Sequence, residues 1–484
     1  MIDIYRPEYH FTPPTNWMND PNGMVFFDGE YHLFYQYHPH STVWGPMHWG
    51  HAVSTDLIHW QHLPIALYPD EIGMIFSGSA VVDVNNTAGF GKNALVAIFT
   101  YNKDYKESQN LAYSTDRGRT WTKYPHNPVV PAPEPLSDCR DPKVFWHEDH
   151  WVMLLAAKDR VLFLTSTDLK NWQQSGSFGG GFGSTIGVWE TPDLFQLPLR
   201  TDGETRWVLT VGVGDGGPSG GSGTQYFIGY FDGITFISEN QRDTILWADY
   251  GADYYAPQSW NNEPHGRRIM FGWMSNWQYA RSVPSDGWRG MFSLPREMAL
   301  TSTMEGVRLV QSPIHELESL RVEGLHWKNQ ILQPGQNLLN DLIGDAFEIV
   351  AEFQVQALTN SFGFHIRQGS GERTTVGYNS RSQKVFIDRT ISGQSAFHTG
   401  FAAVHSAHLE PQNEVVCLHI FVDRCSVEVF ANNGIAAISD LIYPSPQSLG
   451  LELFTEGSEI FIKSLDVYPL SSSTPTHIIQ EGNL

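Results

Sequence analysis

Cysteine is nearly missing from the 484-residue chain, which carries only Cys139, Cys417 and Cys425. Three thiols at these spacings match neither the disulfide framework of a small secreted domain nor a zinc-binding motif. His48 and His51 lie three residues apart, and on a strand such positions face opposite sides of the sheet. We therefore expect no bound metal and no cofactor.

Positive charge is also scarce. The chain has 30 basic residues against 52 acidic ones, which gives a formal net charge of -22. A surface with this excess of negative charge repels phosphate backbones and anionic lipid headgroups. We therefore expect neither nucleic acid nor a membrane surface as a partner.

Long apolar runs are missing as well. None approaches the roughly 20 residues of a membrane-spanning helix, and residues 1–6 lack the basic-then-apolar pattern of a secretory leader. The expected location is the cytoplasm, or outside the cell if a leader has been removed. The sequence leaves the oligomeric state open.

A short repeated motif is present instead. Ser-Thr-Asp occurs at 54–56, 114–116 and 166–168, each time shortly before a tryptophan, and a degenerate copy occupies 231–233. Each copy follows an alternating apolar segment, which predicts a strand, an Asp-capped turn and a Trp-bearing strand. Such a unit, repeated about every 50 to 60 residues, is typical of a β-propeller, and about 300 residues correspond to about five blades.

The character of the sequence changes near Leu300. Residues 314–320 predict a short connecting helix, and beyond about Asp345 short alternating strands return between tight turns, a pattern typical of a β-sandwich. We predict an all-β chain in three parts: a five-bladed propeller over residues 1–300, a linker with a short helix over 301–340, and a C-terminal β-sandwich over 341–484.

The first acidic residue of interest, Asp20, lies in the segment Trp17 to Gly23. An acid between Asn19 and Pro21 is most often just part of a turn. Here an apolar strand follows at once, so the carboxylate is expected at the mouth of the propeller. The neighbouring proline and glycines would hold the backbone that aims it.

Asp141 and Glu190 also precede predicted strands. Arg140 either forms a weak surface ion pair or holds nearby carboxylates ionised, while Trp189 gives Glu190 a partly apolar setting that suits a general acid. If strands of different blades converge on one axis, the three acids meet there. Cleavage of a glycosidic bond needs two of them, roughly 5 Å apart for retention of configuration.

Four motifs together resemble those of glycoside hydrolase family 32, which holds invertases, levanases and inulinases: Trp17 to Gly23, Phe76-Ser77-Gly78-Ser79, Arg140-Asp141-Pro142 and Trp189-Glu190. The likeness runs from Tyr5 to about Glu297 and continues in residues 421–428. Residues 35–39 and 44–51 look most like bacterial levanases. The resemblance implies a five-bladed propeller with a β-sandwich, and no metal.

The resemblance also implies a role for each site residue. Asp20 would be the nucleophile, Glu190 the acid/base, and Asp141 would stabilise the transition state through fructose hydroxyls. The fructose subsite would be lined by Asn19, Gln36, Trp44, Phe76, Ser77, Arg140, Asp249 and Trp277. Two positions depart from the family pattern: Thr191 stands where a Cys is common, and Cys139 where a Phe often precedes the arginine.

The expected activity is that of a retaining β-fructofuranosidase that removes terminal fructosyl units from levan, inulin or sucrose through a covalent fructosyl-enzyme. A fructosyltransferase or an endo-acting levanase could use the same site, and an inverting five-bladed glycosidase of arabinan type is a further alternative. A non-catalytic fructan-binding lectin would lack Asp20 or Glu190, and both are present. The sequence does not decide between the substrates.

Overall fold

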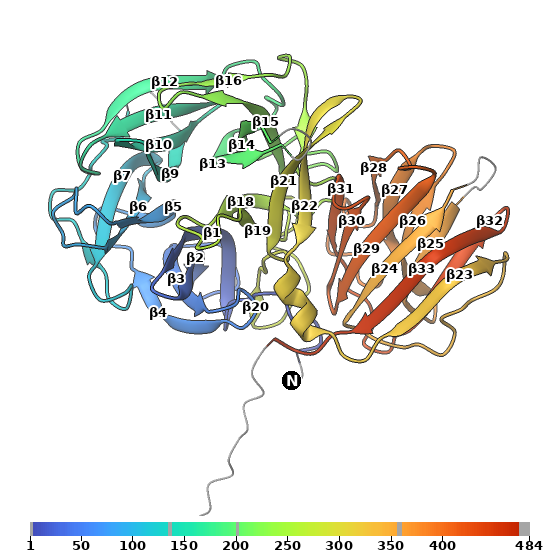
Figure 1. Cartoon of the computed structure of the whole chain (residues 1–484). Coiled ribbons are helices and arrows are strands. Elements are labelled where there is room, and N and C mark those ends of the chain that lie inside the picture. Colours follow the sequence, from blue (N-terminus) through green and yellow to red (C-terminus); the bar gives the residue numbers. More distant parts are fainter. Residues whose placement is uncertain (1–2, 134–137, 200–202, 356–360, 474–484) are drawn as a thin grey trace, which may run out of the picture.

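The computed structural model describes residues 3–133, 138–199, 203–355 and 361–473. Within these ranges the regular structure consists almost entirely of strands (Figure 1). The exception is a six-residue 3-10 helix, η1 (His315–Leu320), at the predicted place of the short helix. Across the described ranges, no helix has the length and apolar character needed to cross a membrane.

The first five sheets formed by the described residues are the blades of a propeller. The first comprises β1 (Asn16–Phe27), β2 (Glu30–His38), β3 (His48–Ser54), β4 (Gln61–Leu67) and the late strand β20 (Trp288–Arg289). The second comprises β5 (Met74–Asp83), β6 (Ala94–Lys103), β7 (Lys106–Ser114) and β8 (Thr122–Lys123). The third comprises β9 (Cys139–His147), β10 (His150–Ala157), β11 (Arg160–Ser166) and β12 (Gln173–Gly179).

The fourth blade comprises β13 (Trp189–Pro198), β14 (Thr205–Val213), β15 (Gly223–Phe231), β16 (Phe236–Ser238) and β17 (Leu246–Trp247). The fifth comprises β18 (Tyr255–Ser259), β19 (Ile269–Trp273), β21 (Arg296–Thr303) and β22 (Gly306–Pro313). The innermost strands β1, β5, β9, β13 and β18 contact one another in a closed ring around the propeller axis (Figure 1). The predicted five-bladed propeller is confirmed.

The repeated Ser-Thr-Asp motif marks the turn between the third and fourth strands of the first three blades. The carboxylates of Asp56 and Asp168 each accept two backbone N–H groups of that turn, and Asp116 accepts one together with a threonine hydroxyl. The indole of the following tryptophan then donates to the carbonyl oxygen three residues before it. Asp232 caps the same turn in the fourth blade.

Two further sheets pack face to face as the C-terminal sandwich. One has six strands: β23 (Leu325–Leu332), β33 (Ile460–Pro469), β24 (Phe347–Gln354), β29 (Val415–Asp423), β30 (Ser426–Ala431) and β31 (Ala436–Leu441). The other has five: β28 (Val404–His408), β27 (Lys384–Ile391), β26 (Glu372–Asn379), β25 (Ser361–Gly369) and β32 (Gly450–Glu456). Alternate residues of both sheets, such as Ile349, Phe364, Leu418 and Leu453, fill a fully buried core.

The domain boundaries of the structure differ from the predicted ones at 300 and 340. Strands β21 and β22 complete the fifth blade, so the propeller extends to Pro313. Strand β23 pairs with β33 and so begins the sandwich at Leu325. Only about ten residues, built around η1, connect the domains. The predicted linker was too long because weakly alternating edge strands do not stand out from loops in the sequence. The last predicted residues, 474–484, lie outside the described range.

Buried charges join the two domains, which lie side by side in Figure 1. Arg296 begins the fifth-blade strand β21 and is fully buried, with Nη1 2.9 Å from Asp249 Oδ2 and Nη2 2.6 Å from Glu428 Oε2 of the sandwich. His10 adds a second link, because Nδ1 lies 2.8 Å from Asp423 Oδ2 and Nε2 lies 3.0 Å from Glu428 Oε1. These buried charges are therefore paired, as burial requires, and Asp423 and Glu428 make the pairing cross from one domain to the other.

This imidazole makes the interface sensitive to pH. Burial alone would lower the pKa of His10, but Asp423 and Glu428 outweigh it and raise the pKa from 6.5 to about 9. The stabilisation is therefore complete below about pH 6.5 and is lost as the pH rises through about 9. We expect His10→Gln to lower the free energy of unfolding by roughly 3 kcal/mol at pH 6, with the deficit shrinking toward pH 9.5.

Urea denaturation at pH 6, 7.5 and 9.5 measures this difference. The exposed His265 provides a matched control, because His265→Gln removes an imidazole that lies outside the interface. A deficit that stays constant across the three pH values would contradict the assignment of a charged His10.

Candidate active site

Strand pairing is interrupted at one level in all five innermost strands. The register shifts lie between Met18 and Pro21 in β1, Ile75 and Gly78 in β5, Arg140 and Lys143 in β9, Glu190 and Asp193 in β13, and Tyr255 and Gln258 in β18. A β-bulge of this kind bends its strand and changes the direction of the side chains next to it. The five bulges therefore turn a ring of side chains toward one end of the propeller axis.

Proline lies within three of these bulges, as Pro142, Pro192 and Pro257, and Pro21 directly follows a fourth. Proline has no N–H to give to a ladder, so inside a sheet it fits mainly at bulges and edges. Three of the preceding residues have left-handed backbone: Asp141 at φ 62°, Thr191 at 47° and Ala256 at 52°. Such backbone is strained for a β-branched threonine, and strain of this sort gathers at functional sites.

A cavity of about 240 Å³ opens at this level. Ten of the eleven predicted site residues line it: Asn19, Asp20, Gln36, Trp44, Phe76, Ser77, Arg140, Asp141, Glu190 and Trp277. Arg281 also lines it and was not predicted from the sequence. The predicted convergence of the three acids on the propeller axis is therefore what the structure shows.

Asp20 lies on β1 between two hydrogen-bond donors. Asn19 Nδ2 donates to Oδ1 at 3.0 Å and Ser77 Oγ donates to Oδ2 at 2.7 Å. Burial raises the pKa of Asp20 from 3.8 to about 6, against the two hydrogen bonds and with help from the charge of Glu190. The carboxylate is thus held in one orientation and ionises near pH 6.

Glu190 is fixed by one cation and one phenol. Arg140 donates to Oε1 from Nη2 at 2.9 Å and from Nε at 3.3 Å, and the hydroxyl of Tyr255 donates to Oε2. Burial and the charge of Glu190 raise the pKa of Tyr255 well above its ordinary value, so the phenol keeps its proton. The other end of the guanidinium is anchored on Glu107 and Asp138.

Sequence reasoning missed Tyr255, although a signal was available. The run Tyr255-Ala256-Pro257 has the same form as Asp20-Pro21, Asp141-Pro142 and Glu190-Thr191-Pro192: a functional side chain just before a proline at the start of an inner strand. Read as a fourth copy of that pattern, it points to the same level of the axis.

Asp141 is the most deeply enclosed of the three acids. Its Oδ2 accepts the backbone N–H of Thr191 at 2.9 Å. Burial raises the pKa of Asp141 well above 3.8; Arg140 opposes this shift, while Glu190 and Asp20 add to it. Three carboxyl groups thus share one cavity with the Arg140 guanidinium, and their like charges disfavour ionisation of all three at once. Thr191, a departure from the family pattern, contributes its backbone, and its buried hydroxyl has no partner among the described residues.

Asp249 does not belong to the cavity, and its predicted place in the fructose subsite is wrong. The side chain is buried at the domain interface, where Oδ2 accepts hydrogen bonds from Arg296 Nη1 at 2.9 Å and from Ser439 Oγ at 2.8 Å. Arg296 is fully buried and needs a counter-charge. Asp249 therefore has a structural role between the domains.

Trp273 and Trp277 lie four residues apart, an even spacing that would put them on one face of a continuous strand, but they do not share a strand. Strand β19 ends at Trp273, which is fully buried, while Trp277 lies beyond the strand and lines the cavity. The ring of Trp277 stacks on Trp17 with centroids 6.1 Å apart. Of the two tryptophans, Trp277 alone is placed to meet a ligand.

Comparison with known proteins agrees with this geometry. Residues 10–313 match the N-terminal domain of glycosyl hydrolases family 32, and residues 316–469 match the C-terminal part of the same family. A levanase of Bacillus subtilis (strain 168) is 54% identical over 96% of this chain and 70% of its own length. A levanase of Bacillus sp. (strain L7) is 42% identical over 96% of this chain, which spans only 52% of that relative.

The solved structure of an exo-inulinase from Aspergillus awamori has the same fold. It superimposes with a TM-score of 0.92 at 38% identity, and the likeness covers 97% of this chain and 99% of that one. A propeller with carboxyl groups gathered at its axis, followed by a β-sandwich, defines a glycoside hydrolase. This chain belongs to glycosyl hydrolase family 32.

Proposed function

We propose that this chain is a retaining β-fructofuranosidase that hydrolyses terminal β-D-fructofuranosyl units of fructans, and also cleaves sucrose. One observation carries the proposal: Asp20, Asp141 and Glu190 meet around Arg140 in a single cavity of a family 32 propeller. The relatives named levanase and exo-inulinase support hydrolysis of fructans rather than fructosyl transfer.

The size of the cavity supports attack at chain ends. At about 240 Å³ it is smaller than the roughly 300 to 1,000 Å³ of a pocket for a drug-sized ligand. It has room for one fructose unit and the start of the next. The rings of Trp44, Phe76 and Trp277 provide apolar walls on which the C–H faces of a sugar can pack.

The chemistry follows from the two hydrogen-bonded acids. Ionised Asp20 attacks the anomeric carbon while Glu190 protonates the departing glycosidic oxygen, which leaves fructose bound to Asp20 as an ester. Glu190, now ionised, takes a proton from water, and that water attacks the same carbon and releases fructose with its configuration retained. Arg140 and Tyr255 hold Glu190 in place through both steps.

Asp141 has a different part in this proposal. Its carboxyl group lines the cavity, with Oδ2 held by the backbone N–H of Thr191, where it can form hydrogen bonds with the hydroxyl groups of a bound fructose. Asp141 thus stabilises the transition state through hydrogen bonds to fructose hydroxyls, without competing with Asp20 for the anomeric carbon. Asn19, Gln36 and Ser77 complete the polar lining.

A product profile on sucrose, levan and inulin tests the proposed function. We expect fructose alone from levan or inulin, because the cavity accepts a chain end. A ladder of oligosaccharides from levan would mean endo action, and oligomers longer than the starting sugar would mean fructosyl transfer.

The two catalytic acids are separable by substitution. Asp20→Ala removes the nucleophile and should lower kcat on sucrose by roughly a thousandfold or more, with the fold intact by circular dichroism. Glu190→Gln should lose roughly 100- to 10,000-fold on sucrose but far less on an aryl β-D-fructofuranoside, whose leaving group needs little protonation. Equal losses on both substrates would rule out Glu190 as the general acid.

The pKa of Asp20 predicts the acidic limb of the pH profile. Because Asp20 must be ionised to attack and its pKa is about 6, kcat/KM on sucrose should fall as the pH drops below about 6. The hydrogen bond from Ser77 lowers that pKa, so Ser77→Ala should move the limb to higher pH. Ser79→Ala, which loses a bond to the Pro142 carbonyl instead, should leave it in place. A limb unmoved in Ser77→Ala would refute the assignment.

A further inference from the structure

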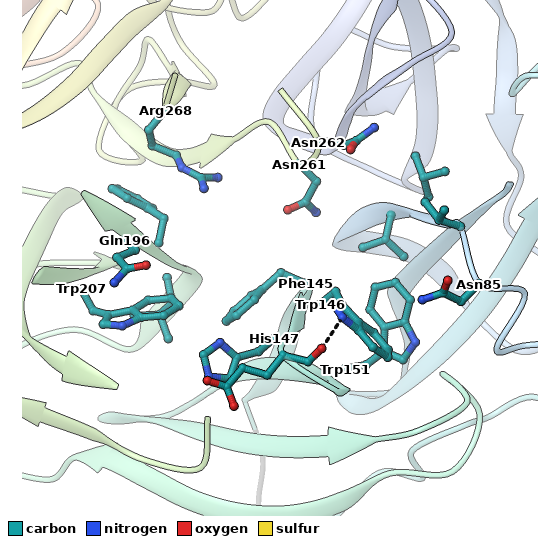
Figure 2. A pocket seen from close by; sticks show the side chains of 16 residues that line it. Asn85, Phe145, Trp146, His147, Trp151, Gln196, Trp207, Asn261, Asn262 and Arg268 are labelled. Atoms are coloured by element: carbon teal, nitrogen blue, oxygen red, sulfur yellow. Dashed lines mark hydrogen bonds between the residues drawn. The ribbon is translucent and has the colours of Figure 1, made fainter. Parts of the chain in front are cut away.

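A second hollow of about 640 Å³ lies at the opposite end of the innermost strands (Figure 2). In β9, Arg140 and Asp141 line the catalytic cavity, whereas Phe145, Trp146 and His147 line this hollow. At about 3.3 Å per residue along a strand, the two sets lie roughly 15 Å apart. We call it the distal hollow; the ends of β5 and β13 and the segment after β18 complete its wall.

A buried ion pair separates the distal hollow from the catalytic cavity. Lys143 Nζ lies 2.9 Å from Asp193 Oδ2 and donates to the carbonyl oxygen of Ser259 at 2.7 Å. The side chains of Lys143 and Asp193 are 3% and 0% exposed, in the middle of β9 and β13. A ligand in the distal hollow therefore does not reach the catalytic acids.

Aromatic rings surround the distal hollow. Trp146 is 39% exposed and stands edge-on to Trp151, with centroids 5.0 Å apart. On the other side the half-buried Trp207 packs against Phe145 at 5.9 Å and against His147 at 5.6 Å. Indole rings that face water in a concave site provide a surface for the C–H faces of a sugar.

Polar groups with unused hydrogen-bonding capacity lie between these rings. Asn261 Nδ2 donates to the carbonyl oxygens of Ala80 and Val144 at 2.8 and 3.0 Å, which fixes the amide while its oxygen accepts no bond within the described ranges. The buried Nε–H of Arg268 likewise has no acceptor there. Figure 2 shows both side chains directed into the hollow. A buried donor without an acceptor is costly unless a ligand or water satisfies it.

The lining indicates the chemistry of the ligand. The fixed amide of Asn261 offers an acceptor and Arg268 Nε–H a donor to hydroxyl groups, and the rings offer apolar faces, so the site fits a polar, uncharged ring compound. The net charge of -22 and the nearby Glu148 disfavour an anion. At about 640 Å³, the hollow has room for several sugar units.

We propose that the distal hollow is a non-catalytic binding site for a neutral oligosaccharide, namely a short segment of a fructan chain. The assignment of the sugar as a fructan rests on the proposed function. The site holds a polymer on the enzyme at a point remote from the bond that is cut. It raises the local concentration of chain ends without taking part in the reaction.

The test removes two exposed side chains of the distal hollow, in Trp146→Ala/Gln196→Ala. The binding assay is native electrophoresis in gels containing levan, with Asp20→Ala as background so that the polymer stays intact. We expect the double substitution to raise the apparent dissociation constant for levan about three- to tenfold, the worth of a lost aromatic contact. In the active protein it should raise KM for levan by a similar factor and leave kcat/KM for sucrose unchanged.

Controls separate the possible results. Tyr105→Ala removes an aromatic side chain that is 89% exposed elsewhere on the propeller and should leave retardation by levan unchanged. Unaltered retardation in the double variant would overturn the distal site, and retardation by dextran but not levan would overturn the fructan assignment. Failure of the wild-type protein to hydrolyse sucrose or levan would instead refute the proposed function and leave the binding result standing.

Discussion

Side chains of a regular strand alternate between the two faces of its sheet, so those of an innermost propeller strand point at the neighbouring blades. An active site on the axis therefore needs each inner strand to depart from regular pairing. The five bulges supply that departure. At or beside four of them, Pro21, Pro142, Pro192 and Pro257 have no backbone N–H with which to restore regular pairing. This one constraint determines the positions of Asp20, Asp141, Glu190 and Tyr255.

Electrostatics then decides what the gathered side chains can do. Three carboxyl groups would repel one another if all were ionised, and Arg140 alone does not neutralise them. The three carboxyl groups have different environments, and this difference separates their roles. Asp20 accepts two hydrogen bonds and has a pKa of about 6, whereas burial raises the pKa of the more enclosed Asp141 well above 3.8. The same arrangement that costs folding energy prepares a nucleophile beside a proton donor.

Much of the fold and of the candidate site could be predicted from the sequence, because these features depend on residues that are neighbours in the chain. The Asp-capped turns repeat because every blade needs the same turn, and the acids next to proline stand out for the same reason. Asp249 could not be placed, since its partners Arg296 and Ser439 are distant in sequence and Ser439 belongs to the other domain. Tyr255 was missed because an aromatic residue in a β-rich chain usually fills a core. The boundary near Leu300 failed because β21 and β22 finish a blade that began before β20.

The buried Lys143–Asp193 pair closes the propeller axis below the catalytic cavity. A fructan that enters from the catalytic side meets a closed end. It therefore cannot pass through the propeller and be shortened repeatedly without dissociating from the enzyme. Each released fructose lies beneath the remainder of its polymer, and that remainder has to withdraw before the sugar can leave. Degradation is consequently distributive at the level of the single cut, and any persistence on one polymer has to come from contacts made outside the cavity.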